Sequence, residues 1–190
     1  MVSPPTPNTF RPADTRPAVA PVSITPFAAL TDDHDVVEML LVGARDPEVL
    51  RKNYLPRPLD HAAARAYLAA TEGVVLRLGG APVGVAAALP DPSPGDGVSV
   101  PAGSVELDMW LLPEARGQGP RWFNPVLAWI AERHAHLVGV TWADNHVAIE
   151  MLRWVGWQHI GTSHWRDDTM AGDCEVFLLD LAAWRARRHR

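Results

Sequence analysis

The residues best suited to acid–base chemistry lie in one short, largely apolar run, from Ser104 to Leu112. In an extended strand, Glu106, Asp108 and Trp110 point to one face and the aliphatic residues between them point to the other. Carboxylates in a strand otherwise fit for burial are costly unless they meet water, a polar partner or a substrate. Two interpretations stay open. The face is either exposed with satisfied acids, or part of an active cleft in which Glu106, or failing it Asp108, is a general base.

A turn that could bind an anion follows this strand directly. Residues 113–119 read Pro-Glu-Ala-Arg-Gly-Gln-Gly, and a helical pattern comes next. Backbone N–H groups converge at such a helix start and the helix dipole is positive there, an arrangement that suits phosphate. Gly117 and Gly119 would let the backbone approach a phosphate closely. By itself this turn is a weak signal, because any sharp turn would use the same residues.

Two blocks of the sequence resemble a known family. Residues 111–119 are similar to the acetyl-coenzyme A signature of the GCN5-related N-acetyltransferase (GNAT) superfamily, which is Gln or Arg, two residues, Gly, one residue, then Gly or Ala. Residues 144–157 resemble the family's Asn-x-x-Ala-Ile helix, with Asn145 at its start and Gly156 at its end. A helix and a strand separate the blocks, as in the family, and the resemblance covers about residues 22–181.

The resemblance implies a fold, an activity and a set of binding residues. The fold would be mixed α/β (α+β), with a mostly antiparallel twisted sheet, splayed central strands and flanking helices. The activity would be direct transfer of an acetyl or other acyl group from acyl-coenzyme A to a primary amine, without a metal. The implied coenzyme A-binding residues are Leu111, Arg116, Gly117, Gln118, Gly119, Arg121, Trp122 and Asn145.

The family also implies how these residues would act. Backbone amides from Arg116 to Arg121 would surround the pyrophosphate, and the pantetheine arm would lie between the strand of Leu111 and the strand of Thr141. A backbone N–H near Leu111 would polarise the thioester carbonyl. Asn145 would bind the pantetheine, although capping a helix is an equally good reason for an Asn at this position.

Three departures from the family pattern affect this assignment. Pro120 lacks an N–H donor, and Arg121 follows it where the family has Gly or Ala. We expect the Arg121 guanidinium either to replace the lost donor on a coenzyme A phosphate or to point to solvent. Pro125, preceded by Asn, predicts that the helix begins late or kinks there. Leu152 occupies the position at which the family often has a thiolate-protonating Tyr, so a Tyr acid from this helix is excluded.

Hydrophobic periodicity predicts the elements that position these residues. We expect Thr31 or Asp32 to cap the first helix and Asp60 the second. The helix after the anion turn is expected to end near Leu137. The expected strands are 22–25, 73–78, 83–89, 104–112, 138–143, 157–165 and 174–181, and the other expected helices run to about residue 45, over 61–72 and over 145–155.

Composition limits the class of protein. The chain has 190 residues, of which 47% are hydrophobic, and a net charge of −5, which disfavours a bulk nucleic-acid binder. No apolar run is long enough to span a membrane, and no secretory signal is recognisable at the N-terminus.

We expect a flexible Pro-rich arm over 1–20, an acetyltransferase domain over 21–182 and a basic, solvated tail over 183–190. Cys174 is the only cysteine, which excludes an intramolecular disulfide and favours the cytoplasm; a nucleophilic role for it is disfavoured.

Alternatives remain at the level of function. The expected partner is a small-molecule or peptide amine, with no nucleic acid or membrane, and the protein would be a monomer or a homodimer. A rival from another class is a non-catalytic coenzyme A-binding or interaction module on the same fold. A further alternative keeps the transfer but uses a longer acyl donor, with Trp110 and Trp122 shaping the site.

Overall fold

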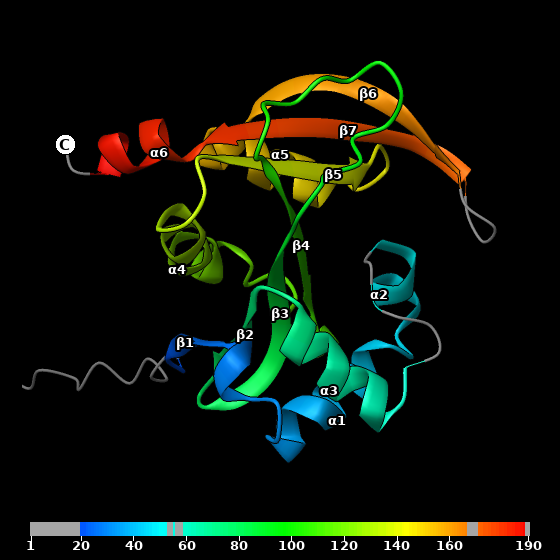
Figure 1. Cartoon of the computed structure of the whole chain (residues 1–190), viewed down its shortest axis with the longest axis vertical. Helices are drawn as coiled ribbons and strands as arrows, with labels where there is room; N and C mark the ends of the chain where they lie inside the picture. Colours follow the sequence, from blue (N-terminus) through cyan, green and yellow to red (C-terminus); the bar gives the residue numbers. More distant parts are fainter. Residues whose placement is uncertain (1–19, 53–54, 56–58, 167–170, 189–190) are drawn as a thin grey trace, which may run out of the picture.

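The structure, a computed structural model, describes residues 20–52, 55, 59–166 and 171–188 (Figure 1). The expected arm lies outside the described residues except for Ala20. The strands are β1 (Val22–Pro26), β2 (Gly73–Leu78), β3 (Ala81–Leu89), β4 (Val105–Leu111), β5 (His136–Trp142), β6 (Gln158–Arg166) and β7 (Ala171–Asp180). The helices are α1 (His34–Gly43), α2 (Pro47–Lys52), α3 (His61–Ala70), α4 (Pro120–Ala131), α5 (His146–Val155) and α6 (Leu181–Arg188), with short 3-10 turns η1 (Phe27–Ala29) and η2 (Pro113–Ala115).

The strands form one mixed sheet in the order β1-β2-β3-β4-β5-β7-β6. Every neighbouring pair runs antiparallel except β4 and β5, which are parallel. The β4–β5 ladder has only two residue pairs, Val105–Leu137 and Glu106–Val138. Beyond Glu106 the two strands diverge, as Figure 1 shows. The prediction of a mostly antiparallel mixed sheet with splayed central strands is therefore confirmed.

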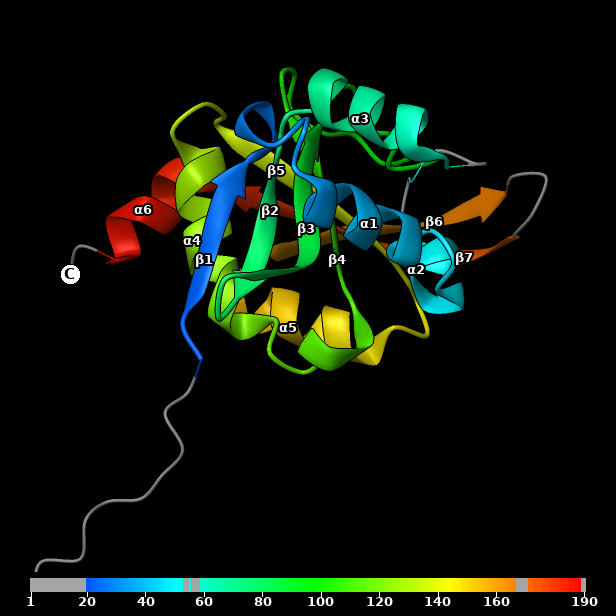
Figure 2. The same cartoon turned by 90° about the horizontal axis from the view of Figure 1, so that it is seen from below.

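Each face of the sheet carries its own hydrophobic core. Figure 2 shows α1 and α3 on one side of the sheet and α5 on the other. Strand alternation sends Val85 and Trp110 into the core beneath α1 and α3. The alternate residues of β3 and β4, which point the other way, contribute to the opposite core. Trp122 of α4 and Trp184 of α6 are buried in that core. The site residues of β4 are therefore held between two packed layers.

The helix after the anion turn excludes one of the two predictions for its start and differs from the prediction at its end. α4 begins at Pro120, so it does not begin late at Pro125, and it ends at Ala131 instead of near Leu137. Pro120 occupies the first helical position, where its missing N–H is not needed and its fixed φ suits the helix. Pro125 lies inside the helix, which costs about 3 kcal/mol. Burial of Val126, Leu127 and Ile130 offsets this cost, because each such side chain stabilises by about 1.5–3 kcal/mol.

Two other predictions about the chain are corrected. The cap of α1 is Asp33 instead of Thr31 or Asp32, and its carboxylate accepts the N–H of Val36 at 3.2 Å. Residues 183–188, expected as part of a solvated tail, belong to α6. That helix packs on the domain because Leu181 and Trp184 are buried, so the folded part of the chain extends to Arg188.

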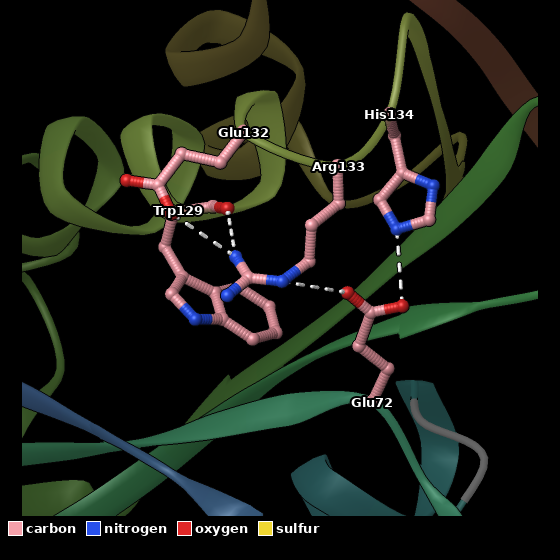
Figure 3. Close-up of polar contacts among 5 residues, drawn as sticks. All are labelled: Glu72, Trp129, Glu132, Arg133 and His134. Atoms are coloured by element: carbon pink, nitrogen blue, oxygen red, sulfur yellow. Dashed lines mark hydrogen bonds and ion pairs between the residues drawn. The ribbon is translucent and has the colours of Figure 1, made fainter.

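A polar cluster fixes the C-terminal end of α4 (Figure 3). Glu72 lies just before β2. Its carboxylate is 3.0 Å from His134 Nε2, a hydrogen-bond distance, and 3.7 Å from Arg133 Nε. The Arg133 guanidinium also lies 4.8 Å from the centre of the Trp129 ring. These contacts tie the C-terminal end of α4 to the residue that precedes β2. None of the helices described is long and apolar enough to cross a membrane.

Candidate active site

The divergence of β4 and β5 opens a cavity of about 870 Å³. At one end it is lined by Arg116, Gly117 and Gly119 of the turn before α4. It passes between the two strands and reaches Glu106 and Asp108. The cavity therefore joins the expected anion-binding turn to the expected catalytic acids through the middle of the sheet.

Glu106 and Asp108 lie on the buried face of β4. Each is 4% exposed and lines the cavity, so the alternative of an exposed sheet face is wrong. The Ser93 amide, in the loop between β3 and β4, is 3.4 Å from Glu106 Oε2, as a weak hydrogen-bond donor. Burial and the nearby Asp108 charge raise the pKa of Tyr67 on α3, which stays a neutral phenol. The two acids thus line the cavity from a strand on which both are buried.

Backbone donors of β4 also face the gap. The Leu112 amide donates to the Val83 carbonyl at 2.8 Å, which is toward β3. Successive N–H groups of a strand point to opposite sides, so those of Met109 and Leu111 point toward β5. The ladder that would have accepted them ends at Val138. The gap therefore presents donors suited to an elongated polar ligand, and to a carbonyl oxygen near Leu111.

The turn before α4 has fewer available amides than the family pattern implies. The N–H groups of Arg116, Gln118 and Arg121 donate to carbonyls within the turn, at 3.2, 3.3 and 2.9 Å, and Pro120 has none. Those of Gly117 and Gly119 make no hydrogen bond with the residues that the structure describes. Gly117 has a φ of 78°, a conformation that favours glycine. An anion at this turn would be held mainly by these two amides.

The side chains of the turn take separate directions. Arg116 lines the cavity but pairs with Asp46 of the α1–α2 connection at 2.6 Å. The Arg121 guanidinium donates to Gln118 Oε1 at 2.6 Å and to the Ala20 carbonyl. Neither Gln118 nor Arg121 lines the cavity, and Trp122 is fully buried in the core beside α4. Of the expected binding residues, the structure thus brings Leu111, Arg116, Gly117, Gly119 and Asn145 to the cavity.

The second block contributes the start of α5. Asn145 occupies the N-cap position, but its side chain makes no capping bond and instead donates from Nδ2 to Thr141 Oγ1 at 3.0 Å. Gly156 ends the helix in the left-handed conformation, with a φ of 94°. Leu152 lines the cavity at the position where the family often has Tyr. This wall is therefore apolar, except for the Asn145–Thr141 pair.

Helix α2 forms a wall that the sequence did not predict. Its Glu48, Val49 and Arg51 line the cavity. The Trp142 indole N–H donates to the Arg51 carbonyl at 2.8 Å, and the Arg51 guanidinium pairs with Asp144. A helix of six residues shows too little periodicity to be recognised. The sequence signal that was available is the Asp-Pro pair at 46–47, an N-cap followed by Pro at the first helical position.

Cys174 of β7 also lines the cavity and is 3% exposed. Burial, together with the nearby charges of Asp173, Glu106 and Glu175, raises the pKa of its thiol to about 11. The thiol is therefore protonated near neutral pH and is a poor nucleophile. Among the residues that the structure describes, no three His, Cys, Asp or Glu side chains are arranged to hold a metal ion.

Comparisons with known proteins bear on the fold. No protein-family model and no curated protein sequence matches the chain. Solved structures do match: an N-acetyltransferase from Staphylococcus aureus is 16% identical, with a TM-score of 0.62 over 85% of this chain and 99% of that one. An acetyltransferase of the GNAT family from Streptococcus pneumoniae is 12% identical, with a TM-score of 0.58 over 84% and 99%. Salmonella typhimurium yncA, solved with its cofactor acetyl-CoA, is 16% identical, with a TM-score of 0.56 over 84% and 94%.

These likenesses define the fold. The chain has the acyl-CoA N-acyltransferase fold of the GNAT superfamily, as the two sequence blocks indicated. One cavity is lined by three features: the diverging strands β4 and β5, the glycine turn before α4, and the start of α5 at Asn145.

Proposed function

We propose that the protein transfers an acyl group, most simply acetyl, from acyl-coenzyme A directly to a primary amine. One observation carries this proposal. A single cavity connects two amides at the start of α4 with two buried carboxylates on β4, through a gap in the sheet. Two sets of backbone donors support the fit to an acyl-coenzyme A substrate. The amides of Gly117 and Gly119 suit its pyrophosphate, and the gap-facing N–H groups of β4 suit the arm that carries the thioester.

The chain's own residues supply three parts of the chemistry. Glu106 accepts the proton that the amine loses as it attacks the thioester, a role worth about 10²- to 10⁴-fold in rate. The N–H groups of Met109 and Leu111 are placed to stabilise the negative charge that develops on the carbonyl oxygen. The buried surroundings of Trp110 and Phe123 help to keep water from the thioester. Asp108 is the alternative base, two residues along the same face.

The acceptor belongs at the Glu106 end of the cavity, between α2 and β7. A small-molecule or peptide amine fits a site of this kind, and a cytoplasmic location would supply the acyl-coenzyme A. Trp122 does not line the cavity, and Trp110 lines it but is only 4% exposed, with its indole packed against Gly43 of α1, so neither tryptophan is a strong candidate to limit the length of the acyl chain.

Binding and turnover test the proposal separately. Acetyl-coenzyme A at about 100 times its dissociation constant should raise the free energy of unfolding by about 2.7 kcal/mol. A thermal-shift titration measures this, and thiol release with a panel of amines measures turnover. No stabilisation at millimolar acetyl-coenzyme A would contradict the proposal, and stabilisation without turnover of any amine would favour the non-catalytic module.

The general base has its own test. Glu106→Gln keeps the shape of the side chain and should lower kcat by about tenfold or more, with little change in coenzyme A affinity. Glu150→Gln is a matched control, because Glu150 on α5 is 77% exposed and does not line the cavity. Full activity in Glu106→Gln, with loss in Asp108→Asn, would move the role to Asp108.

A further inference from the structure

The wall of the cavity formed by β5 and α5 contains one polar pair. Gly139 and Thr141 lie on the face of β5 that meets α5, because Leu137, two residues before Gly139, belongs to the core on that side. Thr141 and Asn145 both line the cavity, and so do Ala148 and Leu152 of the same helix. The Thr141 hydroxyl therefore lies in the same wall as the leucine that replaces the family's tyrosine.

The hydrogen-bonding state of this hydroxyl is defined by Asn145. Thr141 Oγ1 accepts a hydrogen bond from Asn145 Nδ2 at 3.0 Å. A hydroxyl that accepts in this way keeps its own hydrogen for a second partner. No bond from the Thr141 hydroxyl to another described residue uses that hydrogen. The residue opposite Thr141 on β7 is Glu175, whose carboxylate is paired with His159 at 2.5 Å.

We propose that Thr141 is a catalytic residue that donates a hydrogen bond to the departing sulfur of the acyl donor, with Asn145 as the residue that positions it. This proposal rests on the proposed function. When the amine nitrogen forms its bond to the acyl carbon, the C–S bond breaks and its electron pair stays on sulfur. The Thr141 O–H stabilises that thiolate, the amine proton goes to Glu106, and the thiolate takes a proton from water at the mouth of the cavity.

The chemistry explains why a hydroxyl suffices here. A threonine hydroxyl is too weak an acid to protonate a thiolate, but it is a good donor to one, and hydrogen bonds to charged groups are stronger than neutral ones. Asn145 strengthens the arrangement because a donor bond to Oγ1 polarises the O–H further. The apolar side chain of Leu152 offers the sulfur no competing partner.

Substitutions that separate shape from hydrogen bonding test the proposal. Thr141→Val keeps the volume and removes the hydroxyl, and should lower kcat by about tenfold to a hundredfold with little change in the KM for the amine. Thr141→Ser keeps the hydroxyl and should restore most of kcat. If Thr141→Val does not fold, Thr141→Ala takes its place in the comparison with Thr141→Ser.

A binding measurement checks the sulfur contact without turnover. Calorimetry at pH 9.5 compares coenzyme A, part of whose thiol is then ionised, with desulfo-coenzyme A, which has no sulfur. The wild-type protein should bind coenzyme A several-fold more tightly than the desulfo compound, and Thr141→Val should bind both alike. Equal preference in wild type and Thr141→Val, or an unchanged kcat, would overturn the role of Thr141 while turnover in the wild type upheld the proposed function. Failure of the wild type to bind either compound would overturn both.

Discussion

Asp46 is expected to fasten α2 to the turn before α4, and its replacement by Asn tests this directly. Asp46 Oδ1 accepts the N–H groups of Glu48 and Val49 at 2.8 and 3.3 Å, which caps α2. Its Oδ2 accepts from Arg116 at 2.6 Å. Burial opposes ionisation of this carboxyl, but the two amides and the Arg116 guanidinium outweigh it and hold the pKa of Asp46 below its usual value.

The two functions of Asp46 can be separated by choice of substitution. Asn caps a helix as well as Asp does, so Asp46→Asn removes only the charge, whereas Asp46→Ala removes the cap as well. The Arg116 side chain is 40% exposed and solvent screens the pair, so Asp46→Asn should cost less than about 1 kcal/mol. Asp46→Ala should cost about 1 kcal/mol more. For a chain of this size, each kcal/mol lowers Tm by about 2–4 °C.

The same change should affect the active site through α2. Because Glu48 and Val49 line the cavity, looser anchoring of α2 should raise the KM for the amine more than it lowers kcat.

The difference in the free energy of unfolding between wild type and Asp46→Asn also depends on pH. A carboxyl with a lowered pKa stabilises the fold above its unfolded pKa of about 3.9, and that contribution is lost as the pH falls through the folded pKa.

A double-mutant cycle decides whether the pair matters. Urea unfolding of Asp46→Asn, Arg116→Gln and the double variant should give a coupling energy of about 0.5–1 kcal/mol. Arg153→Gln, at a 56% exposed arginine on α5, is the matched control and should be additive with Asp46→Asn. Strict additivity of Arg116→Gln with Asp46→Asn would refute the anchoring of α2 through this ion pair.

Two further predictions concern buried positions of the sheet. Because the thiol pKa of Cys174 is raised to about 11, only about one thiol in a thousand is ionised at pH 8, and mass spectrometry should find the native protein unmodified by iodoacetamide; rapid labelling at that pH would contradict the assigned burial. A Cβ at Gly84 would lie 2.2 Å from the Trp110 carbonyl oxygen, so Gly84→Ala should destabilise by about 1–3 kcal/mol in urea unfolding, and an unchanged midpoint would be inconsistent with this close approach.

Much of the sheet and the position of the cavity could be predicted from the sequence. Alternation in β4 placed Glu106 and Asp108 on one face, and the two sequence blocks implied the splay that opens the cavity. Both features depend on local pattern, because burial of one strand face repeats every two residues. What pattern alone left open was whether that face is solvated, since this depends on α1, α3 and the loop that cover it.

The same local signal had opposite outcomes at two places. Asp46-Pro47 and Asn124-Pro125 are both an N-cap residue followed by proline. The first pair begins α2, whereas the second lies inside α4. The difference lies in the neighbours, because Phe123 and Val126, on either side of the second pair, are buried in the core, and continuing the helix keeps both there. Such tertiary effects could not be read from the local sequence.

Arg121 shows the same limit for a side chain. The sequence placed a guanidinium next to the phosphate turn, and both a phosphate contact and exposure to solvent were plausible. The structure instead directs it to the Ala20 carbonyl, about a hundred positions earlier in the chain, and to Gln118. The two groups meet only because β1 packs beside α4. A rule based on the spacing of residues along the sequence cannot predict such a contact.

The splay that creates the cavity also weakens the sheet, and this links ligand binding to stability. Once the β4–β5 ladder ends at Glu106, the gap-facing N–H groups of β4 have no strand partner, and buried unpaired donors cost free energy. The two halves of the sheet are then held together by contacts across the gap, including the Trp142–Arg51 bond and the packing of Gly95 on Ser163. A ligand that accepts hydrogen bonds from those N–H groups removes the cost. It should therefore stabilise proteins with intact bridging contacts more than variants in which a bridging contact is weakened. Weakening a bridge such as the Trp142–Arg51 bond should therefore lower ligand affinity, in addition to any direct contact that Trp142 makes as a residue lining the cavity.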